Sequence, residues 1–238
     1  GEELLARILA ERRKNWQGKG PYKEPAPPNT AKYGSIPAGW IVASLEQLTS
    51  PERPICYGIL MPKENVANGV LFVTVKDMKG DKIDLDSLRR TAPEIAMKYE
   101  RASLKTGDLL LSIRGTYGRV AEVPKELDGG NITQDTARLD VTRMVSHRYI
   151  ATYLRNPDCQ QYFKRVARGV AVKGVNIGDV RPAPISLPPL AEQVRIVAEV
   201  ERRLSVVEEL EATVDANLQR ATRLRQSMLQ KAFEGKLK

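Results

Sequence analysis

The residues that could perform chemistry are few and scattered along the 238-residue chain. The single histidine, His147, cannot build a histidine-rich metal site, and its basic and aromatic neighbours do not supply a catalytic triad. Asp81, Asp84 and Asp86 are spaced closely enough for a metal cluster, although a solvated acidic turn is the commoner outcome of such spacing. Glycine-rich phosphate loops and dinucleotide-binding motifs are absent from the sequence. The sequence therefore predicts a chain with no catalytic residue and no metal site of its own.

Arginine and lysine are the side chains whose distribution indicates a function. The formal net charge is +9, and between Arg143 and Lys173 seven basic residues accompany a single acidic one, Asp158. Such a segment favours a face that binds nucleic acid, and the alternative is a solvated helix surface. A second basic feature is the loop Arg114–Arg119, where glycines separate two arginines between two predicted strands. Backbone N–H groups and guanidinium groups of such a loop are suited to contacting phosphates.

The cysteine content and the hydropathy restrict the cellular compartment in which we expect the chain to function. Cys56 and Cys159 are far apart and form no CxxC pair, so we expect two reduced thiols and neither a disulfide framework nor a zinc site. No apolar run approaches the roughly 20 residues that a membrane span requires, and no signal-peptide pattern opens the sequence. These features predict a cytoplasmic protein. Because Gly1 lies inside a helical pattern, we expect the chain to be part of a longer gene product.

The elements that must position these side chains are mostly short. Strands are predicted over residues 69–75, 107–113 and 116–123, with a further pair at 132–133 and 137–139 after the Asp128–Asn131 turn. Helices are predicted over residues 44–48, 85–90, 93–99 and 147–167. Strands and helices do not alternate regularly, so the pattern predicts an α+β (mixed α/β) domain rather than a doubly wound sheet.

The two ends of the chain are helical. Residues 2–16 read as the end of a helix, and a Pro/Gly-rich linker follows over residues 17–35. At the other end, no Gly or Pro interrupts Leu190–Phe233, and Gly235 fits the position just past a helix. The apolar residues that recur along this segment at helical spacing are Val200, Leu204, Val207, Leu210, Val214, Leu218, Ala221, Leu224 and Met228. One narrow apolar stripe on a helix of this length predicts a coiled coil, in which Glu211 and Arg225 fall on the seam and set its register.

Several segments of the sequence resemble those of a known family. Leu187-Pro188-Pro189-Leu190-Ala191-Glu192-Gln193, followed by Arg195-Ile196-Val197, and the distant Ala232-Phe233-Glu234-Gly235-Lys236-Leu237 are similar to the conserved helical region of type I restriction-modification specificity (S) subunits. Ile36-Pro37-Ala38-Gly39-Trp40 resembles the opening of their target recognition domains, and Gly107–Thr116 resembles their GDLL…RG segment. The resemblance spans the chain, which has one such domain and one complete helical region where family members usually have two.

The resemblance implies a division of the chain and a set of partners. It assigns residues 1–16 to the end of a conserved helix, 17–35 to a linker, 36–187 to a DNA target recognition domain, and 188–238 to a long helix for coiled-coil pairing and methyltransferase docking. The implied partners are double-stranded DNA, the methyltransferase (M) subunits and the restriction/translocase (R) subunit. Because only one complete helical region is present, we expect either a missing amino-terminal half or a second copy of the chain, paired through the C-terminal helix, to cover the rest of the apolar stripe. The implied cofactors, S-adenosylmethionine, ATP and Mg²⁺, serve the partner subunits, and none is expected on this chain.

Within this scheme the chain is a non-catalytic subunit that reads one half of a bipartite DNA site. Side chains able to contact phosphates or base edges are the DNA-binding candidates: Lys76, Lys79, Arg89, Arg90, Arg114, Thr116, Tyr117, Arg119, Asn131, Gln134, Arg168, Lys173 and Asn176. Tyrosines that could line the same cleft or be buried are Tyr57, Tyr99 and Tyr117. Polar residues expected on the outer face of the long helix are the partner-docking candidates: Glu192, Gln193, Arg195, Glu199, Arg202 and Arg203.

Two alternatives remain from the residues alone. A structural coiled-coil adaptor with a basic globular head would have no affinity for any duplex. A nuclease or nucleotide-modifying enzyme would cleave or modify DNA by itself, although no ligand set for it is present in the sequence.

Overall fold

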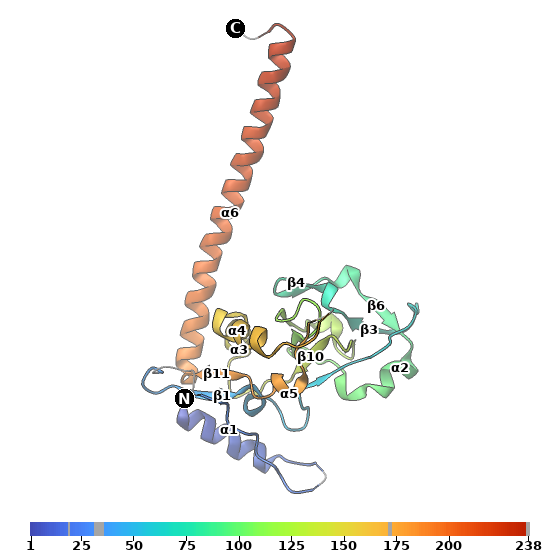
Figure 1. The fold of residues 1–238 in the computed structure, drawn as a ribbon, viewed down its shortest axis with the longest axis vertical. Coiled ribbons are helices and arrows are strands. Elements are labelled where there is room, and N and C mark those ends of the chain that lie inside the picture. The colour runs from blue at the N-terminus through green and yellow to red at the C-terminus, as the bar shows by residue number, and fades with distance from the viewer. Residues whose placement is uncertain (19, 31–35, 171–172, 237–238) are drawn as a thin grey trace. The chain divides into compact units, whose positions relative to one another are not determined.

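The computed structural model describes residues 1–18, 20–30, 36–170 and 173–236. The chain divides into two compact units, Gly1–Val194 and Arg195–Lys238. The end of the predicted linker, residues 31–35, and Leu237 of the AFEGKL segment lie outside the described residues. Mixed helices and sheets followed by one long helix confirm the predicted fold class (Figure 1).

The N-terminal helix packs on the body of the first unit. It is α1, Glu2–Lys14, two residues shorter than predicted, with Leu5 and Ile8 buried and Arg12, Arg13 and Lys14 in its last turn. Cations at this end stabilise the helix through its dipole. The described residues between Asn15 and Trp40 form no helix or strand, as the proline-rich composition predicts.

A two-stranded sheet closes the body. Strand β1 (Ile41–Ser44) pairs antiparallel with β11 (Pro184–Leu187), so the start and the end of the body are hydrogen-bonded to each other. The predicted short helix follows as a 3-10 turn, Leu45–Leu48. Ser44 caps it, because Gln47 N donates to Ser44 Oγ over 3.4 Å and Ser44 N donates to Gln47 Oε1 over 2.8 Å.

The largest sheet has four strands in the order β2-β10-β7-β8, all paired antiparallel. Their bounds are β2 Cys56–Tyr57, β10 Thr136–Leu139, β7 Leu109–Ser112 and β8 Val120–Glu122. The predicted hairpin of residues 107–123 is confirmed, with Leu109 opposite Glu122. All four residues of β7 and of β10 are buried, so these are the interior strands.

A three-stranded sheet, β6-β3-β9, contradicts two predictions. It consists of β3 (Val70–Val73), antiparallel β6 (Arg89–Thr91) and parallel β9 (Asn131–Ile132), beside the small hairpin β4 (Met78–Lys79) and β5 (Lys82–Ile83). The helix predicted over 85–90 is wrong, because only the 3-10 turn Leu85–Ser87 forms and Arg89 enters a strand. The expected pairing of 132–133 with 137–139 is also wrong. Those strands bind different neighbours in different sheets, since long-range partners rather than the turn decide the pairing.

The helices of the body pack around the sheets. They are α2 (Pro93–Lys98), α3 (His147–Arg155), α4 (Pro157–Val166) and the short α5 (Ile177–Val180), with 3-10 turns at Glu100–Ala102 and Lys125–Leu127. The single helix predicted over 147–167 is therefore wrong. Pro157 forces Asn156 into an extended conformation (ψ 154°), and the Asn156 side chain then caps α4 by accepting from Cys159 N over 2.9 Å.

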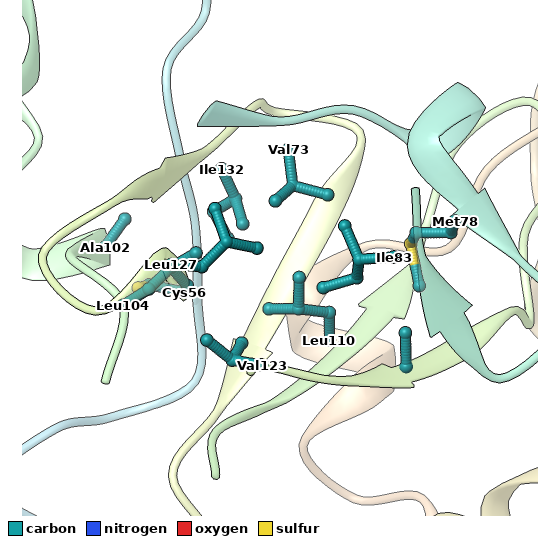
Figure 2. Close-up of a cluster of buried hydrophobic side chains, with 11 residues drawn as sticks. Cys56, Val73, Met78, Ile83, Ala102, Leu104, Leu110, Val123, Leu127 and Ile132 are labelled. Atoms are coloured by element: carbon teal, nitrogen blue, oxygen red, sulfur yellow. The ribbon is translucent and has the colours of Figure 1, made fainter. Parts of the chain in front are cut away.

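A core of buried apolar side chains joins the four-stranded sheet, the three-stranded sheet and the β4–β5 hairpin (Figure 2). Leu110 and Ala121 come from the four-stranded sheet, Val73 and Ile132 from the three-stranded sheet, and Met78 from the β4–β5 hairpin. Cys56 lies in this core, and both Cys56 and Cys159 are free thiols. Loops that connect these strands lie at the surface.

The long helix α6, Leu190–Phe233, has the predicted bounds. Gly235 adopts the left-handed conformation (φ 67°), and Lys236 N donates to Lys231 O over 2.8 Å, which closes the helix as the Gly predicted. The apolar stripe is exposed, with Leu204 and Met228 each 54% accessible. Within the described residues, no helix is both long and apolar enough to cross a membrane.

Candidate nucleic-acid interface

The β7–β8 loop is a rigid platform for Arg114 and Thr116. Gly115 and Gly118 take left-handed conformations (φ 67° and 90°), which glycine adopts at low cost. Ser112 Oγ donates to Thr116 O over 2.7 Å and accepts from Arg119 N over 2.8 Å, and Gly118 N donates to Ser112 O over 2.9 Å. The loop is thus held from inside, while Arg114 and Thr116 point outward as exposed residues.

A distant segment brings two further cations beside this loop. Gly174 forms antiparallel bridges to both Arg114 and Arg168, Gly115 N donates to Lys173 O over 3.2 Å, and Val175 N donates to Ile113 O over 2.7 Å. Arg168 and Lys173 are exposed, and Arg168 lies 3.8 Å from Asp179. Backbone pairing therefore brings Arg114, Arg168 and Lys173 close together, and all three are exposed.

Gln134 joins the same group. Its Oε1 accepts from Arg114 Nη1 over 3.0 Å, and its Nε2 donates to Leu60 O over 3.4 Å. The amide therefore lies beside the Arg114 guanidinium and orients it.

A broad groove of about 1230 Å³ lies between the β7–β8 loop and α4. It is lined by Gly115, Thr116, Tyr117, Pro157, Gln160, Gln161, Lys164 and Arg165. Gln160 Nε2 donates to Gly118 O over 2.9 Å and to Leu154 O over 2.7 Å, which fixes the helix to the loop. We did not single out Gln160 and Gln161 from the sequence. The available signal was their i, i+4 spacing from Lys164 and Arg165 on one helix face.

Not every cation of the basic segment faces this groove. Arg155 binds elsewhere, because Nη2 donates to Val120 O over 3.0 Å, and partial burial lowers the pKa of its guanidinium. Burial likewise raises the pKa of the Tyr162 phenol, which donates to Asp179 O. The positive charge that lines the groove comes from Lys164 and Arg165.

Two predicted DNA-binding residues form side-chain hydrogen bonds to other residues of the chain. Arg119 Nη1 donates to Val75 O over 3.2 Å and to Met78 O over 2.9 Å, so this arginine ties the turn after β3 to the β7–β8 loop. Asn131 is 2% exposed, with Nδ2 donating to Tyr99 O and Oδ1 accepting from Ile132 N. Arg119 thus makes a structural contact, which is one of the two roles predicted for its loop, and Asn131 is buried among its own hydrogen-bond partners.

The remaining candidates fall into separate places. Lys76 and Lys79 are exposed on the turn that Arg119 anchors and on β4. Arg89 and Arg90 lie on the edge strand β6, where Arg89 covers the Phe72 ring and Arg90 Nη1 donates to Gly69 O over 3.0 Å. Asn176 is exposed at the start of α5. Of the tyrosines, Tyr117 lines the groove, Tyr57 lies under Arg101, and Tyr99 is half-buried.

The docking candidates at the start of α6 also need correction. Gln193 was expected to be exposed but is 0% accessible, because Oε1 accepts from Ser146 N over 2.9 Å and Nε2 donates to Pro188 O over 2.9 Å. Glu192 is half-buried and accepts from Trp40 Nε1 over 3.0 Å. These two motif residues bind the body of their own unit. Further along, Arg195 is exposed, and Glu199 pairs with Arg202 and Arg203 on the helix surface.

In the part of the chain that the structure describes, the other side chains that could perform chemistry do not form a common site. His147 Nδ1 lies 3.1 Å from Gly107 O at the start of α3. Among the described residues, no group of three His, Cys, Asp or Glu side chains is arranged to hold a metal ion, and Asp81, Asp84 and Asp86 remain a surface turn.

Comparison with known proteins gives the family. The family model described as "Type I restriction modification DNA specificity domain" matches residues 62–220. The specificity subunit of the type I restriction enzyme EcoBI from Escherichia coli is 30% identical over 203 residues, covering 85% of this chain and 43% of that protein. The EcoKI specificity subunit of E. coli K12 is 29% identical over 146 residues, covering 59% of this chain and 32% of that protein. The chain thus spans less than half the length of these relatives.

Solved structures share the fold. The HsdS subunit from Thermoanaerobacter tengcongensis matches with a TM-score of 0.62 and 24% identity, covering 85% of this chain and 51% of that one. A chain from a structure that describes assembly and conformational transition of the type I R-M system matches with a TM-score of 0.65 and 21% identity, covering 99% of this chain and 54% of that one. The match over two thirds of the sequence confirms the resemblance drawn from the motifs: the chain belongs to the type I restriction-modification DNA specificity domain family.

Proposed function

We propose that this chain is the DNA-recognition part of a type I restriction-modification specificity subunit and reads one half of a bipartite site. The observation that carries the proposal is the clustering of Arg114, Arg168 and Lys173 beside a groove lined by Lys164 and Arg165. Positive charge held on a preformed surface suits the phosphates of a duplex. Family membership supports the same reading.

The proposed contacts divide into two kinds. Arg114, Thr116, Lys164, Arg165, Arg168 and Lys173 are the phosphate contacts, because they are exposed around the groove. The other candidates have donors suited to base edges: Gln134, Lys76, Lys79, Asn176, Arg89 and Arg90. Arg119 and Asn131 have no part in this proposal.

In the proposed assembly, other chains carry out the catalytic reactions. Methyltransferase subunits dock on this chain, a restriction/translocase subunit completes the complex, and S-adenosylmethionine, ATP and Mg²⁺ belong to those subunits. The proposal places the chain in the cytoplasm, where DNA and these cofactors are available. Arg195, Glu199, Arg202 and Arg203 remain the proposed docking residues on α6.

The test is the salt dependence of duplex binding. Fluorescence anisotropy with duplexes selected from a random library is expected to show affinity that falls steeply with salt. Arg114→Ala and Lys173→Ala are each expected to reduce the slope of log K against log salt by about one unit. Lys98→Ala on α2 removes the same charge outside the groove and is the matched control.

Three results would contradict the proposal. Binding that does not depend on salt would rule out the phosphate contacts, and no binding to any duplex favours the coiled-coil adaptor. Metal-dependent cleavage of DNA by the isolated chain favours the nuclease.

A further inference from the structure

An exposed apolar loop lies beside the cationic group. Leu60 is 47% and Met61 is 74% accessible, directly after the fully buried Ile59. A single exposed apolar residue is ordinary on a protein surface. This pair is informative because it lies next to the proposed phosphate contacts.

The loop cannot turn its apolar side chains inward. On one side, Ile59 N donates to Ile132 O over 2.7 Å and Ile59 O accepts from Gln134 N over 2.9 Å. On the other side, Pro62 O accepts from Thr91 Oγ1 over 2.8 Å, and Lys63 takes a left-handed conformation (φ 57°) that is rare for a residue with a side chain. Anchors before and after Met61 hold the loop tip outward.

Gln134 connects this loop to the arginine. The same amide donates to Leu60 O and accepts from Arg114 Nη1. The exposed residues Leu60, Met61 and Lys63 are therefore joined through this amide to the Arg114 guanidinium.

We propose that Met61, supported by Leu60, is a wedge that enters a base step of the bound duplex while Arg114 holds the adjacent phosphate. Proteins that kink DNA combine cationic and amide side chains with an apolar wedge, for which methionine and leucine are suitable residues. The flexible, polarisable methionine side chain adapts to the space between two bases. Two apolar residues flanked by cations make a small patch that fits a base step better than a protein interface of ordinary size. This inference rests on the proposed function and adds to it a deformation of the DNA, which gives specificity at positions without hydrogen bonds.

The experiment uses duplexes selected from a random library, with 2-aminopurine placed at each position of the selected site in turn. Binding of the unchanged chain is expected to raise 2-aminopurine fluorescence several-fold at one base step. Met61→Ala is expected to abolish the rise and weaken binding about tenfold, whereas Met61→Leu keeps both. Met97→Ala on α2 is the matched control, because Met97 is also 74% exposed. Thermal unfolding of each variant shows that the fold is retained.

The outcomes separate this inference from the proposed function. Binding of a duplex with no fluorescence rise at any position overturns the wedge alone, whereas failure to bind any duplex overturns the proposed function and the wedge with it. If deoxyuridine in place of thymine weakens binding as much as Met61→Ala does, and fluorescence stays flat, Met61 contacts a thymine methyl group and the wedge is wrong. Loss of methyltransferase-subunit binding in Met61→Ala, with duplex binding and fluorescence unchanged, also overturns it.

Discussion

Arg138 shows that a cation in this chain need not serve DNA. It lies in the interior strand β10 and is 0% exposed. Its Nη2 donates to Pro54 O over 3.2 Å and to Arg101 O over 3.0 Å, while Nη1 reaches Arg53 O over 3.4 Å. One guanidinium thus satisfies three backbone carbonyls that converge on the edge strand β2.

Replacing this residue tests its structural role. Arg138→Met is expected to lower the free energy of unfolding by about 3 kcal/mol, because three part-buried carbonyls lose their charged donor. Urea unfolding followed by circular dichroism measures the loss. A variant as stable as the unchanged chain would show that the carbonyls find other partners.

At the scale of an element, the β7–β8 hairpin depends on two glycines in different surroundings. A Cβ on Gly115 would meet nothing within 4 Å, whereas a Cβ on Gly118 would lie 2.2 Å from Gln160 Oε1. Both residues have positive φ, so alanine strains the backbone at either position. Only the change at Gly118 also displaces the amide that fixes α4 to the loop.

The two glycines therefore form a matched pair. Gly115→Ala is expected to cost about 1 kcal/mol of stability, and Gly118→Ala about 2–3 kcal/mol, because the second loses the Gln160 hydrogen bonds as well. Thermal unfolding measures both. Equal losses would mean that Gln160 moves aside freely.

Within α6, Glu199 forms a local ion-pair cluster. The side-chain hydrogen bonds from Arg202 and Arg203 lower the pKa of Glu199 from its ordinary value of 4.5 to about 2. A carboxylate with a lowered pKa stabilises the folded state above its ordinary pKa, and this contribution is lost as the pH falls from about 4.5 through about 2. The group is exposed, so the effect is local to the helix surface.

The titration can be measured directly. NMR of the Glu199 side-chain carboxyl carbon is expected to show a midpoint near 2, and the double variant Arg202→Ala, Arg203→Ala is expected to move it back toward 4.5. A midpoint that is the same in both chains would mean that the cluster does not persist in solution.

At the scale of the whole molecule, the seam of α6 requires a second helix. Val207 and Val214 are 46% and 63% exposed along the apolar stripe. A single helix of 44 residues with such a stripe gains most of its stability by pairing. We propose that a second copy of this chain, antiparallel through α6, supplies the partner and unites two recognition domains on one palindromic site.

The mass in solution tests this pairing. Light scattering at micromolar concentration is expected to give twice the 26.5 kDa of one chain. Val207→Glu with Val214→Glu is expected to give a monomer, because charges on the seam are not compatible with burial. Ala212→Glu with Gln219→Glu adds the same charge on the outer face and should leave the mass unchanged. A monomeric unchanged chain would contradict the pairing.

The sequence by itself determined the features that depend on neighbours along the chain. The uninterrupted helical period set the bounds of α6, Gly235 set its end, and Ser44 marked the start of a helical turn. Two strands joined by a glycine-containing loop were enough to predict the β7–β8 hairpin. The family followed from the motifs, and the comparisons confirmed it.

Only the tertiary structure decided which polar side chains face solvent. Arg114 and Arg119 belong to one loop, yet the first is exposed beside Lys173 and the second is bound to carbonyls after β3. Gln193 looked like a docking residue but is bound to Ser146 N, and Asn131 looked like a base reader but is buried. The local sequence determines which backbone conformation each segment favours. Burial and hydrogen-bond partners come from segments far apart in the chain, and no periodicity in the sequence encodes which of them meet.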